Sequence, residues 1–396
     1  MTNDNIKKGI ILLIRSAIEG TPVVLPDNFT WDEALKVAGM HQITSILWYG
    51  VHKSGIKLPD DIHVRLKQET YCAAFMDECQ NNELSELFNA FSDNNIDYMP
   101  LKGILLKQFY SKPEMRLMGD ADILIRVEQY KVISDIMKRL KYYENVESDH
   151  ELIWSKFPAI VIELHKRLIP SYNKDYYAYF GDGWQLAQRS EYDKFRYEMG
   201  AEDQLIYLFT HFSKHYRDGG VGIKHFVDFW VFLSNNPELN MDYIQRELTK
   251  LQLYQFYLNI LNTIDVWFRG TPTNEVSSFI TERLFASGAY GLNSEKLVAA
   301  SVKSMKSAGS ASRARMVKVF TTIFAPYSSM CTRYPALKIM PILLPAFWAV
   351  RMIQAVLFKP ENVRKQIANM RIITVNNIKR YHDELNYVGL DFNFKE

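Results

Sequence analysis

Hydrophobic residues change their spacing twice along the chain, and the changes divide it into helical and strand-like stretches. Up to residue 95 they recur at roughly helical spacing, for example at Ile62, Leu66, Leu84 and Leu87. Short apolar runs then predict buried strands at 96–101, 121–125 and 159–164, with helices at 104–110 and 128–140. The helical spacing returns at residue 201 and predicts helices at 201–216, 223–233, 241–268, 274–285 and 294–305.

The order of these elements predicts the fold class. Strand, helix, strand, helix, strand within about 70 residues matches the size of a minimal α/β core. We therefore expect an α+β, mostly α protein in which a small mixed sheet is embedded between helical regions. The expected division is an N-terminal helical region at 1–95, an α/β core at 96–170, a helical domain at 171–310 and a basic C-terminal helical segment at 311–396.

The composition is that of an ordinary globular protein, with 47% hydrophobic and 23% charged residues. The apolar stretch at 339–358 has the length of a membrane span, but Arg351 near its centre would cost about 2.5–3.5 kcal/mol there. We expect a buried core helix first, an interfacial helix second, and no transmembrane span. Arg15 and Glu19 interrupt the apolar N-terminal run, so we expect a helix there instead of a signal peptide, and a cytoplasmic protein with reduced cysteines.

Charge is unevenly distributed along the chain. Residues 313–380 carry twelve Lys and Arg residues and a single acidic residue, Glu361, which gives this segment a formal charge of +11. The whole chain has a net charge of +2, so the remainder is strongly acidic. The basic segment predicts a surface that meets an anion, which is nucleic acid, a peripherally contacted membrane or the acidic remainder of the same chain.

Two carboxylates, Asp120 and Asp122, carry the clearest chemical signal. They lie at positions i and i+2 at the start of the second expected strand, so their side chains project to the same side. Two negative charges repel unless a cation lies between them, and hard oxygen ligands suit Mg²⁺ or Mn²⁺. We expect a metal site here, with Gly119 leaving room for a ligand. The alternative is an Asp pair that caps the turn before the strand.

A third carboxylate, Glu163, interrupts the third expected strand. A strand this apolar carries an acid mainly where the acid is paired or ligates a metal. We expect Glu163 to complete the metal site, and the alternative is an ion pair with Arg116 or Lys166.

Lys102 and Gly103 stand where a strand turns into a helix. Backbone N–H groups at such a helix start bind phosphate, and a glycine removes the steric barrier. We expect Lys102 and Gly103 to contact nucleotide phosphates. Arg116 is expected either to clamp a phosphate or to hold Asp120.

These residues together resemble a known family. The run LKG, a short helix, Tyr110, Pro113, Arg116, then GDADILI and later IELH, is similar to the uncharacterised nucleotidyltransferase family of bacteria, in the polymerase-β-like nucleotidyltransferase superfamily. The resemblance is specific over residues 100–170. It is looser over 201–233, where DQLIYLFTHFSKHY and KHFVDFWVFL look like the helical half of the family.

The resemblance implies a nucleotidyltransferase-type sheet and assigns roles to individual residues. Asp120 and Asp122 match the metal-binding pair, and Glu163 matches the third acid. Lys102-Gly103 takes the place of the superfamily's Gly-Ser turn. The hydroxyl that usually holds a phosphate is therefore absent, and Lys102 would have to replace it.

The resemblance also bears on the helical half. In the superfamily a helical domain stacks on the nucleotide, which implies that His211 and His215 face the bound nucleotide together with Lys214 or Lys224. The alternative is a polar helix face that is hydrogen-bonded to Asp203 or Asp228.

Taken together, the sequence predicts a Mg²⁺- or Mn²⁺-dependent nucleotidyltransferase that moves a nucleotide from a nucleoside triphosphate to an acceptor. Asp120, Asp122 and Glu163 would hold the metal and form the catalytic set. The expected acceptor is a small molecule or glycan precursor linked to polysaccharide synthesis, and RNA or protein comes second. The alternative functions are a non-catalytic nucleotide- and metal-binding assembly protein that docks through its basic C-terminal segment, and a toxin-like RNA or protein nucleotidyltransferase.

Overall fold

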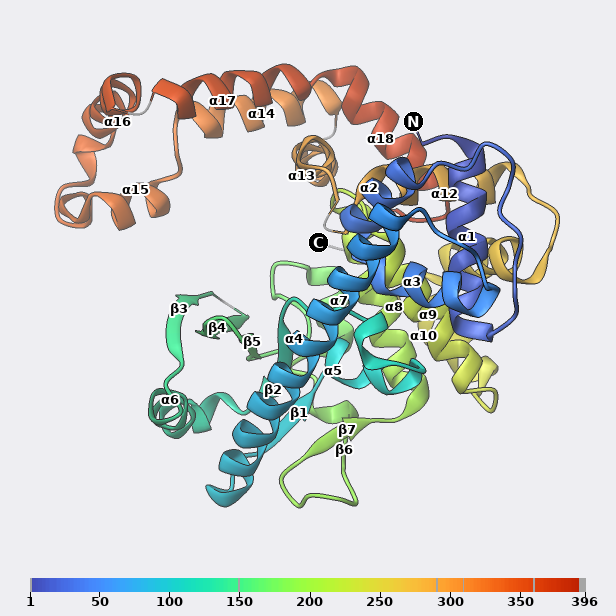
Figure 1. Ribbon diagram of the computed structural model, residues 1–396. Helices are drawn as coiled ribbons and strands as arrows, with labels where there is room; N and C mark the ends of the chain where they lie inside the picture. The colour runs from blue at the N-terminus through green and yellow to red at the C-terminus, as the bar shows by residue number, and fades with distance from the viewer. Residues whose placement is uncertain (1, 149, 290, 309, 359, 392–396) are drawn as a thin grey trace. The chain divides into compact units, whose positions relative to one another are not determined.

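The computed structural model of the protein describes residues 2–148, 150–289, 291–308, 310–358 and 360–391 (Figure 1). Its described residues form two compact units. The first comprises the chain up to residue 213 together with 221–289, and the second comprises 214–220 and the described residues from 291 onward. The boundary falls within helix α8 (Ala201–Arg217). All strands of the described residues belong to the first unit, which confirms a mostly helical α+β fold with one small mixed sheet.

Four helices open the first unit: α1 (Asp4–Glu19), α2 (Trp31–His41), α3 (Thr44–Ser54) and α4 (Asp60–Asp93). Helix α1 packs against α3. Helix α4 begins after Pro59. The acidic side chains of Asp60 and Asp61 in its first turn interact favourably with the positive end of the helix dipole and so stabilise the helix start. A small apolar cluster of Leu35, Trp48 and Leu66 fixes the start of α4 against α2 and α3.

The central sheet has five strands in the order β1-β2-β5-β4-β3. They are β1 (Tyr98–Pro100), β2 (Ala121–Ile125), β3 (Tyr143–Glu147), β4 (Glu151–Lys156) and β5 (Ile160–His165). β2 and β5 pair in parallel, and the other neighbours pair antiparallel. The three strands predicted from apolar runs are present, whereas the hairpin β3–β4 was not predicted. Helix α6 (Tyr130–Arg139) and this hairpin together form the connection between β2 and β5.

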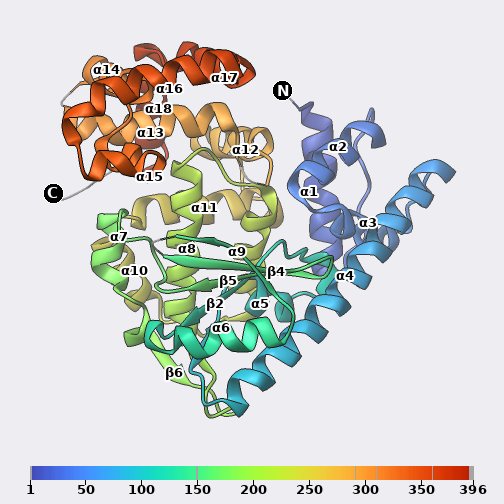
Figure 2. The same cartoon turned by 90° about the vertical axis from the view of Figure 1, so that its left-hand side faces the viewer.

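Side chains alternate between the two faces of this sheet. On one face Ile123, Ile162 and Trp154 pack with Phe91 of α4 and Ile136 of α6 in one apolar cluster. Figure 2 shows α4 and α6 covering this face. Because successive strand residues point to opposite sides, the neighbouring residues of β2, β5 and β4 point to the other face. The polar residues of the candidate site therefore share the face of the sheet opposite this cluster.

The rest of the first unit is helical apart from a small two-stranded sheet. Its elements are α5 (Gly103–Leu106), α7 (Lys174–Phe180), β6 (Ala187–Arg189), β7 (Tyr197–Met199), α9 (Ile223–Asn235), α10 (Met241–Lys250), α11 (Tyr254–Ile264) and α12 (Glu275–Ser287). The range 241–268, predicted to be helical, contains the two helices α10 and α11. Gln252 has a left-handed φ of 57° between them, which breaks the helix at that point. A π-helical turn, Asp265–Arg269, then follows α11.

One buried histidine ties three helices of this unit together. His41, at the end of α2, accepts a hydrogen bond at Nδ1 from the backbone N–H of Ile223 at 3.2 Å. Its Nε2 lies 3.2 Å from the carbonyl oxygen of Phe285. Because Nδ1 is an acceptor, Nε2 carries the proton and donates it to that carbonyl. The neutral ring therefore suits both contacts, and burial lowers the pKa of His41 to about 4.

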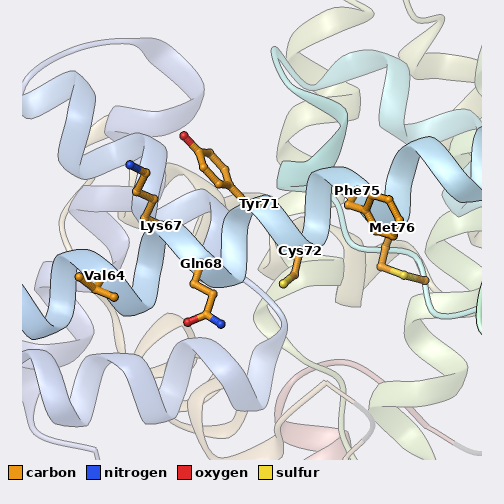
Figure 3. A pocket seen from close by; sticks show the side chains of 7 residues that line it. All are labelled: Val64, Lys67, Gln68, Tyr71, Cys72, Phe75 and Met76. Carbon is orange, nitrogen blue, oxygen red and sulfur yellow. The ribbon is translucent and has the colours of Figure 1, made fainter.

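The outer side of α4 carries apolar side chains that the described residues of the first unit leave largely uncovered. Val64, Tyr71 and Phe75 are exposed, and Phe75 keeps 69% of its surface accessible. Together with Lys67, Gln68, Cys72 and Met76 they line an open pocket (Figure 3).

The second unit consists of helices α13 (Asn293–Ala308), α14 (Ala311–Ile323), α15 (Tyr327–Arg333), α16 (Leu344–Phe358), α17 (Pro360–Ile372) and α18 (Val375–Tyr387). The apolar stretch 339–358 is helical only from Leu344, because the segment before it contains Pro341 and forms a short 3₁₀ turn, Pro341–Leu343. Within the described part of the chain, no helix is both long and apolar enough to cross a membrane.

Candidate active site

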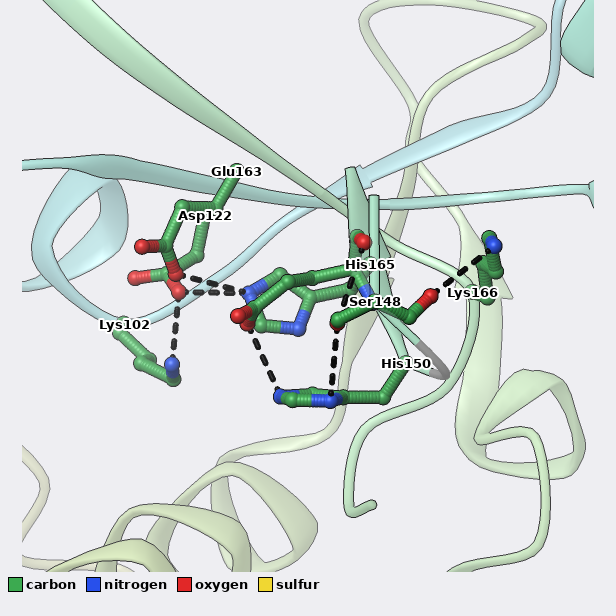
Figure 4. A network of polar contacts seen from close by, with 8 residues as sticks. Lys102, Asp122, Ser148, His150, Glu163, His165 and Lys166 are labelled. Carbon is green, nitrogen blue, oxygen red and sulfur yellow. Dashed lines mark hydrogen bonds and ion pairs between the residues drawn. The ribbon is translucent and has the colours of Figure 1, made fainter. Parts of the chain in front are cut away.

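Asp122 is the centre of a buried polar cluster on the sheet face opposite the core. It lies on β2, and only 5% of it is accessible. Lys102 Nζ donates a hydrogen bond to its Oδ1 at 2.6 Å, and His165 Nε2 lies 2.7 Å from the same oxygen (Figure 4). Burial by itself would raise the pKa of Asp122, but Lys102 and His165 outweigh it and hold this pKa well below its usual range. Asp122 is therefore a carboxylate, neutralised by groups of the chain itself.

The two cationic partners are shifted in the complementary direction. Burial disfavours a charged lysine, yet the Asp122 carboxylate raises the pKa of Lys102 well above its ordinary value. Burial likewise disfavours a charged imidazole, and hydrogen bonds to Asp122 and Glu163 raise the pKa of His165. The Lys102 ammonium and the His165 imidazole thus each direct an N–H group at Asp122 Oδ1.

Glu163 stands beside Asp122 because of the strand register. The parallel pairing of β2 with β5 places Asp122 opposite Glu163, and His165 follows two residues later on the same face of β5. His165 Nε2 is 3.7 Å from Glu163 Oε2. One ligand atom from each of Asp122, Glu163 and His165 lies within 4.8 Å of the other two. Among the described residues, these three form the group that can hold a metal ion.

His165 was not predicted as a ligand. The sequence does contain the signal, because Glu163 and His165 lie two apart on an apolar strand and must share a face. The two basic residues named as alternative partners of Glu163 are engaged elsewhere. Arg116 pairs with Asp228, and Lys166 Nζ lies 2.8 Å from Glu147.

Asp120 lies at the mouth of the site, just before β2. Asp120 is exposed to water, and so is the neighbouring Gly119. Partial burial raises the pKa of Asp120, and the carboxylates of Asp122 and Glu163 raise it further, whereas Lys102 opposes them. The mutual effect of the three carboxylates indicates that they face one another. Of the two aspartates, Asp120 is the more accessible and has the higher pKa.

The donor set fits a small divalent cation. Two carboxylates supply hard oxygen atoms, and an imidazole nitrogen adds a ligand that first-row transition metals favour over Mg²⁺. His165 Nδ1 is buried and has no hydrogen-bond partner among the described residues. The ring is therefore held on the Nε2 side alone, the side that faces the carboxylates. Asp122, Glu163 and His165 would hold such an ion, with Asp120 at the open side.

A second histidine lies close to the site. His150 Nε2 is 2.9 Å from Glu151 Oε2, and its Nδ1 is 3.3 Å from the Ser148 hydroxyl (Figure 4). The rings of His150 and His165 are 6.2 Å apart between centroids. Glu151 faces His165 across the antiparallel pairing of β4 with β5. The hairpin β3–β4 thus supplies a further polar wall.

Lys102 and Gly103 lie at the turn between β1 and α5, where the sequence predicted them. Lys102 adopts a left-handed φ of 45°, unusual for a residue with a side chain, and its ammonium points to Asp122. A Cβ atom on Gly103 would stand 3.1 Å from Arg116 Nη1 and 3.3 Å from Met118 Cγ. Gly103 therefore makes room for the Arg116 guanidinium.

Arg116 is part of a buried ion pair next to this turn. Its Nε and Nη2 donate to the two carboxylate oxygens of Asp228 at 3.1 and 2.9 Å. Tyr110 donates its hydroxyl hydrogen to Asp228 at 2.8 Å. Burial opposes the charge on Arg116, but Asp228 raises the pKa of the guanidinium. This bidentate geometry fixes α9, which carries Asp228, against the loop that precedes β2.

Lys224, which the sequence offered as an alternative to Lys214 beside the two histidines, lies on the first turn of α9. Its Nζ donates to Gln42 Oε1 at 2.6 Å. Burial and the nearby Arg116 lower the pKa of Lys224 to about 8. It is also close enough to Asp120 to oppose the raised pKa of that carboxyl. Nothing in its spacing distinguishes it from other lysines, since only the packing of α9 buries it.

His211, Lys214 and His215 all lie on α8. The ring of His211 is 6.4 Å from that of Tyr207, one helical turn earlier. Tyr207 itself is buried beside Lys102, and burial raises its pKa to about 12. Lys214 and His215 lie in the last turn of the helix, in the second unit. Their role at the nucleotide stays a prediction.

The sequence was compared with known protein families, curated proteins and solved structures. The model of the family described as "Uncharacterised nucleotidyltransferase" matches residues 27–269, more than half of the chain. The match includes the whole central sheet and the helices α4 to α9 that surround it. No curated protein and no solved structure matches the chain.

Proposed function

We propose that this chain, which belongs to the uncharacterised nucleotidyltransferase family, transfers a nucleotide from a nucleoside triphosphate to an acceptor in a reaction that depends on Mg²⁺ or Mn²⁺. The observation that carries the proposal is the convergence of Asp122, Glu163 and His165 within 4.8 Å, with Asp120 at the open side. Three converging carboxylates in a member of a nucleotidyltransferase family suit a divalent ion that is bound together with a triphosphate.

The reaction would be an in-line displacement at the α-phosphorus of the nucleotide. An acceptor oxygen forms a bond to phosphorus, and the bond from phosphorus to the oxygen bridging the α and β phosphates breaks, so pyrophosphate leaves. A divalent ion held by Asp122, Glu163 and His165 would supply positive charge to the phosphate oxygens. The acceptor proton goes to a carboxylate, and we assign this role to Glu163 or Asp120.

Asp120 suits proton transfer because its pKa is raised by burial and by the two neighbouring carboxylates. A carboxylate with a raised pKa holds a proton better than a free one, and proton transfer gains when the pKa approaches the working pH. Asp122 does not suit that role, because Lys102 and His165 depress its pKa. We therefore assign Asp122 to ligand binding alone.

Phosphate binding is assigned to Lys102, with Gly103, Gly119, Arg116, His211, Lys214 and His215 as the other proposed nucleotide contacts. Lys102 is the best supported of them, since its ammonium lies at the centre of the site. A lysine has three N–H donors, so it can keep Asp122 and still donate to a phosphate oxygen. Arg116 can contribute only a donor that Asp228 does not use.

The proposal is tested by pyrophosphate release from each of ATP, GTP, CTP and UTP, with Mg²⁺ or Mn²⁺. Sugar phosphates and glycan precursors are offered first as acceptors, and RNA and protein second. The variants are Glu163→Gln and Asp120→Asn, both of which keep the side-chain volume. We expect each to lose at least about a hundredfold in rate, the scale of a positioned acid or base.

Asp135→Asn is the matched control. Asp135 is exposed on α6, which covers the opposite face of the sheet. Full activity in Glu163→Gln and Asp120→Asn would refute the proposal, as would the lack of a response to every nucleotide. Nucleotide-dependent stabilisation of the fold without pyrophosphate release would instead identify a non-catalytic binding protein.

A further inference from the structure

Helix α16 of the second unit turns its polar residues inward. Arg351 Nη1 donates a hydrogen bond to the carbonyl oxygen of Ile323 at 2.9 Å, at the end of α14. Gln354 Oε1 accepts one from the Tyr334 hydroxyl at 2.8 Å. The sequence placed Arg351 at the centre of an apolar stretch, and these contacts explain it. A cation at a helix C-terminus meets the unpaired carbonyls and the negative end of the dipole.

The opposite side of α16 is apolar and faces water. Val350, Ile353 and Leu357 follow one another at positions i, i+3 and i+7, so they form one stripe of the helix. Ile353 is 59% and Leu357 67% exposed. In the segment just before the helix, Ile339 and Ile342 are each 85% exposed. Leu344, Phe347 and Trp348 of the same helix pack on the apolar cluster of Met330, Cys331 and Leu337, so α16 has an apolar stripe on its exposed side in addition to the one on its core.

The segment of the chain that contains this apolar surface is also strongly basic. Glu361 is the single acidic residue of the sequence between Arg313 and Arg380. The exposed basic residues of that segment, among those whose side chains are described, include Arg313, Arg315, Arg333, Lys338, Arg364, Lys365 and Arg371. A partner of this surface must therefore offer an apolar interior together with negative charge.

A second copy of the chain fits poorly, because two such surfaces would bring their positive charges together. Nucleic acid supplies the negative charge, but its bases stack on aromatic rings and would leave a stripe of aliphatic side chains without an apolar partner. A bilayer with anionic headgroups supplies both. An apolar stripe with Lys and Arg beside it is the composition of helices that lie in the membrane interface.

We propose that the second unit docks on an anionic lipid bilayer through the exposed face of α16 and the segment before it. Ile353, Leu357 and Ile342 enter the boundary between headgroups and acyl chains, and the surrounding Arg and Lys side chains contact lipid phosphates. No helix crosses the bilayer in this arrangement, in keeping with Arg351 bound to the end of α14. This inference is independent of the proposed transferase activity.

Flotation of the full-length protein with vesicles tests the proposal. One set is pure phosphatidylcholine, and the other contains a third of phosphatidylglycerol. We expect binding to the anionic vesicles, weakened by salt, and little binding to the neutral ones. Ile353→Asp/Leu357→Asp and Arg364→Glu/Lys365→Glu should each reduce the bound fraction by about tenfold or more.

Helix α4 provides the matched controls. Phe75→Asp removes an equally exposed apolar residue, and Lys67→Glu reverses an exposed lysine, both outside the basic segment. We expect both to bind like the wild type. Thermal unfolding by circular dichroism shows whether each variant is folded, and Leu357→Ser is the milder replacement if the double aspartate variant is not.

Several results would overturn the proposal. The first is absence of wild-type binding to anionic vesicles, and the second is unchanged binding of the α16 variants. The third is a wild-type dimer in lipid-free sedimentation that the α16 variants disrupt, because it would identify a second copy as the occupant. The fourth is tight, salt-sensitive RNA binding that Arg364→Glu/Lys365→Glu abolishes and Ile353→Asp/Leu357→Asp leaves intact.

Discussion

Replacing Arg116 by methionine should lower the free energy of unfolding by about 3–5 kcal/mol, the usual cost of leaving one partner of a buried ion pair alone. The structure supports the upper part of this range. Arg116 and Asp228 are each only 5% accessible, and two hydrogen bonds of 3.1 and 2.9 Å join them. Methionine fills much of the space but leaves the Asp228 carboxylate with the Tyr110 hydroxyl as its remaining close donor.

The double variant Arg116→Met/Asp228→Leu separates the charge from the packing. With both charges removed, no unpaired ion is left in the interior, so most of the lost stability should return. Tyr110 then loses its acceptor, which costs about 1 kcal/mol and should leave the double variant slightly below the wild type. The recovery is therefore expected to be large and incomplete.

Urea unfolding followed by tryptophan fluorescence measures these differences, because six of the seven tryptophans lie in the first unit. Arg139→Met, an exposed arginine at the end of α6, is the control and should change stability by less than about 0.5 kcal/mol. The reasoning fails if Arg116→Met is as stable as the wild type but no longer binds nucleotide. Arg116 would then serve the ligand and not the fold.

Three further changes probe the polar clusters of the first unit. Gly103→Ala should cost about 1–3 kcal/mol in the same urea assay, because its Cβ would stand 3.1 Å from Arg116 Nη1. In the wild type, the free energy of unfolding measured in urea should fall by about 3 kcal/mol between pH 6.5 and 4. The reason is that the unfolded His41 ring takes up a proton in this range, whereas the buried ring, with a pKa of about 4, does not. The variant His41→Gln should lack this loss. Lys102→Met should make Mn²⁺ binding tighter in calorimetry while slowing turnover, because the ammonium 2.6 Å from Asp122 competes with any cation at that carboxylate.

Each of these predictions has its own contrary outcome. Gly39→Ala is the control for the glycine change, since its Cβ would meet nothing within 4 Å, and equal effects of the two alanines would remove the steric argument. Parallel pH profiles of wild type and His41→Gln would mean that the buried ring is not the source of the acid loss. Weaker Mn²⁺ binding by Lys102→Met would mean that the lysine supports the metal site instead of competing with it.

Local pattern was sufficient for much of the architecture. The strands at Ala121–Ile125 and Ile160–His165 are short apolar runs, and the spacing of α6 shows its buried side directly. The hairpin β3–β4 escaped because β3, with the sequence YENVE, carries polar residues on both faces of an edge strand. An edge strand pairs with a neighbour on one side alone and commonly carries charged residues that discourage further pairing, so its sequence need not alternate.

The site was predictable only in part, for a related reason. That Asp122 and Glu163 share a face follows from their positions, but their adjacency depends on the parallel register of two strands separated by the 34 residues 126–159, which form a helix and a hairpin. Arg116 illustrates the opposite case. Its charge suggested phosphate, whereas long-range packing brought α9 and Asp228 to it. Partner choice between distant charges is a property of the tertiary structure, and one sequence does not encode it locally.

The pairing of Asp122 with Lys102 and His165 has a thermodynamic consequence for ligand exchange. Because Lys102 and His165 already neutralise the buried Asp122 carboxylate, Asp122 can stay charged in the interior without a bound metal ion. A divalent cation that enters this pocket must take over from a proton, so its uptake releases one and becomes weaker as the solution becomes more acidic. In the proposed reaction the ion could therefore enter and leave with each nucleotide while the fold stays assembled. The metal would then act as a co-substrate of the transferase, and the stability of the fold would not depend on it.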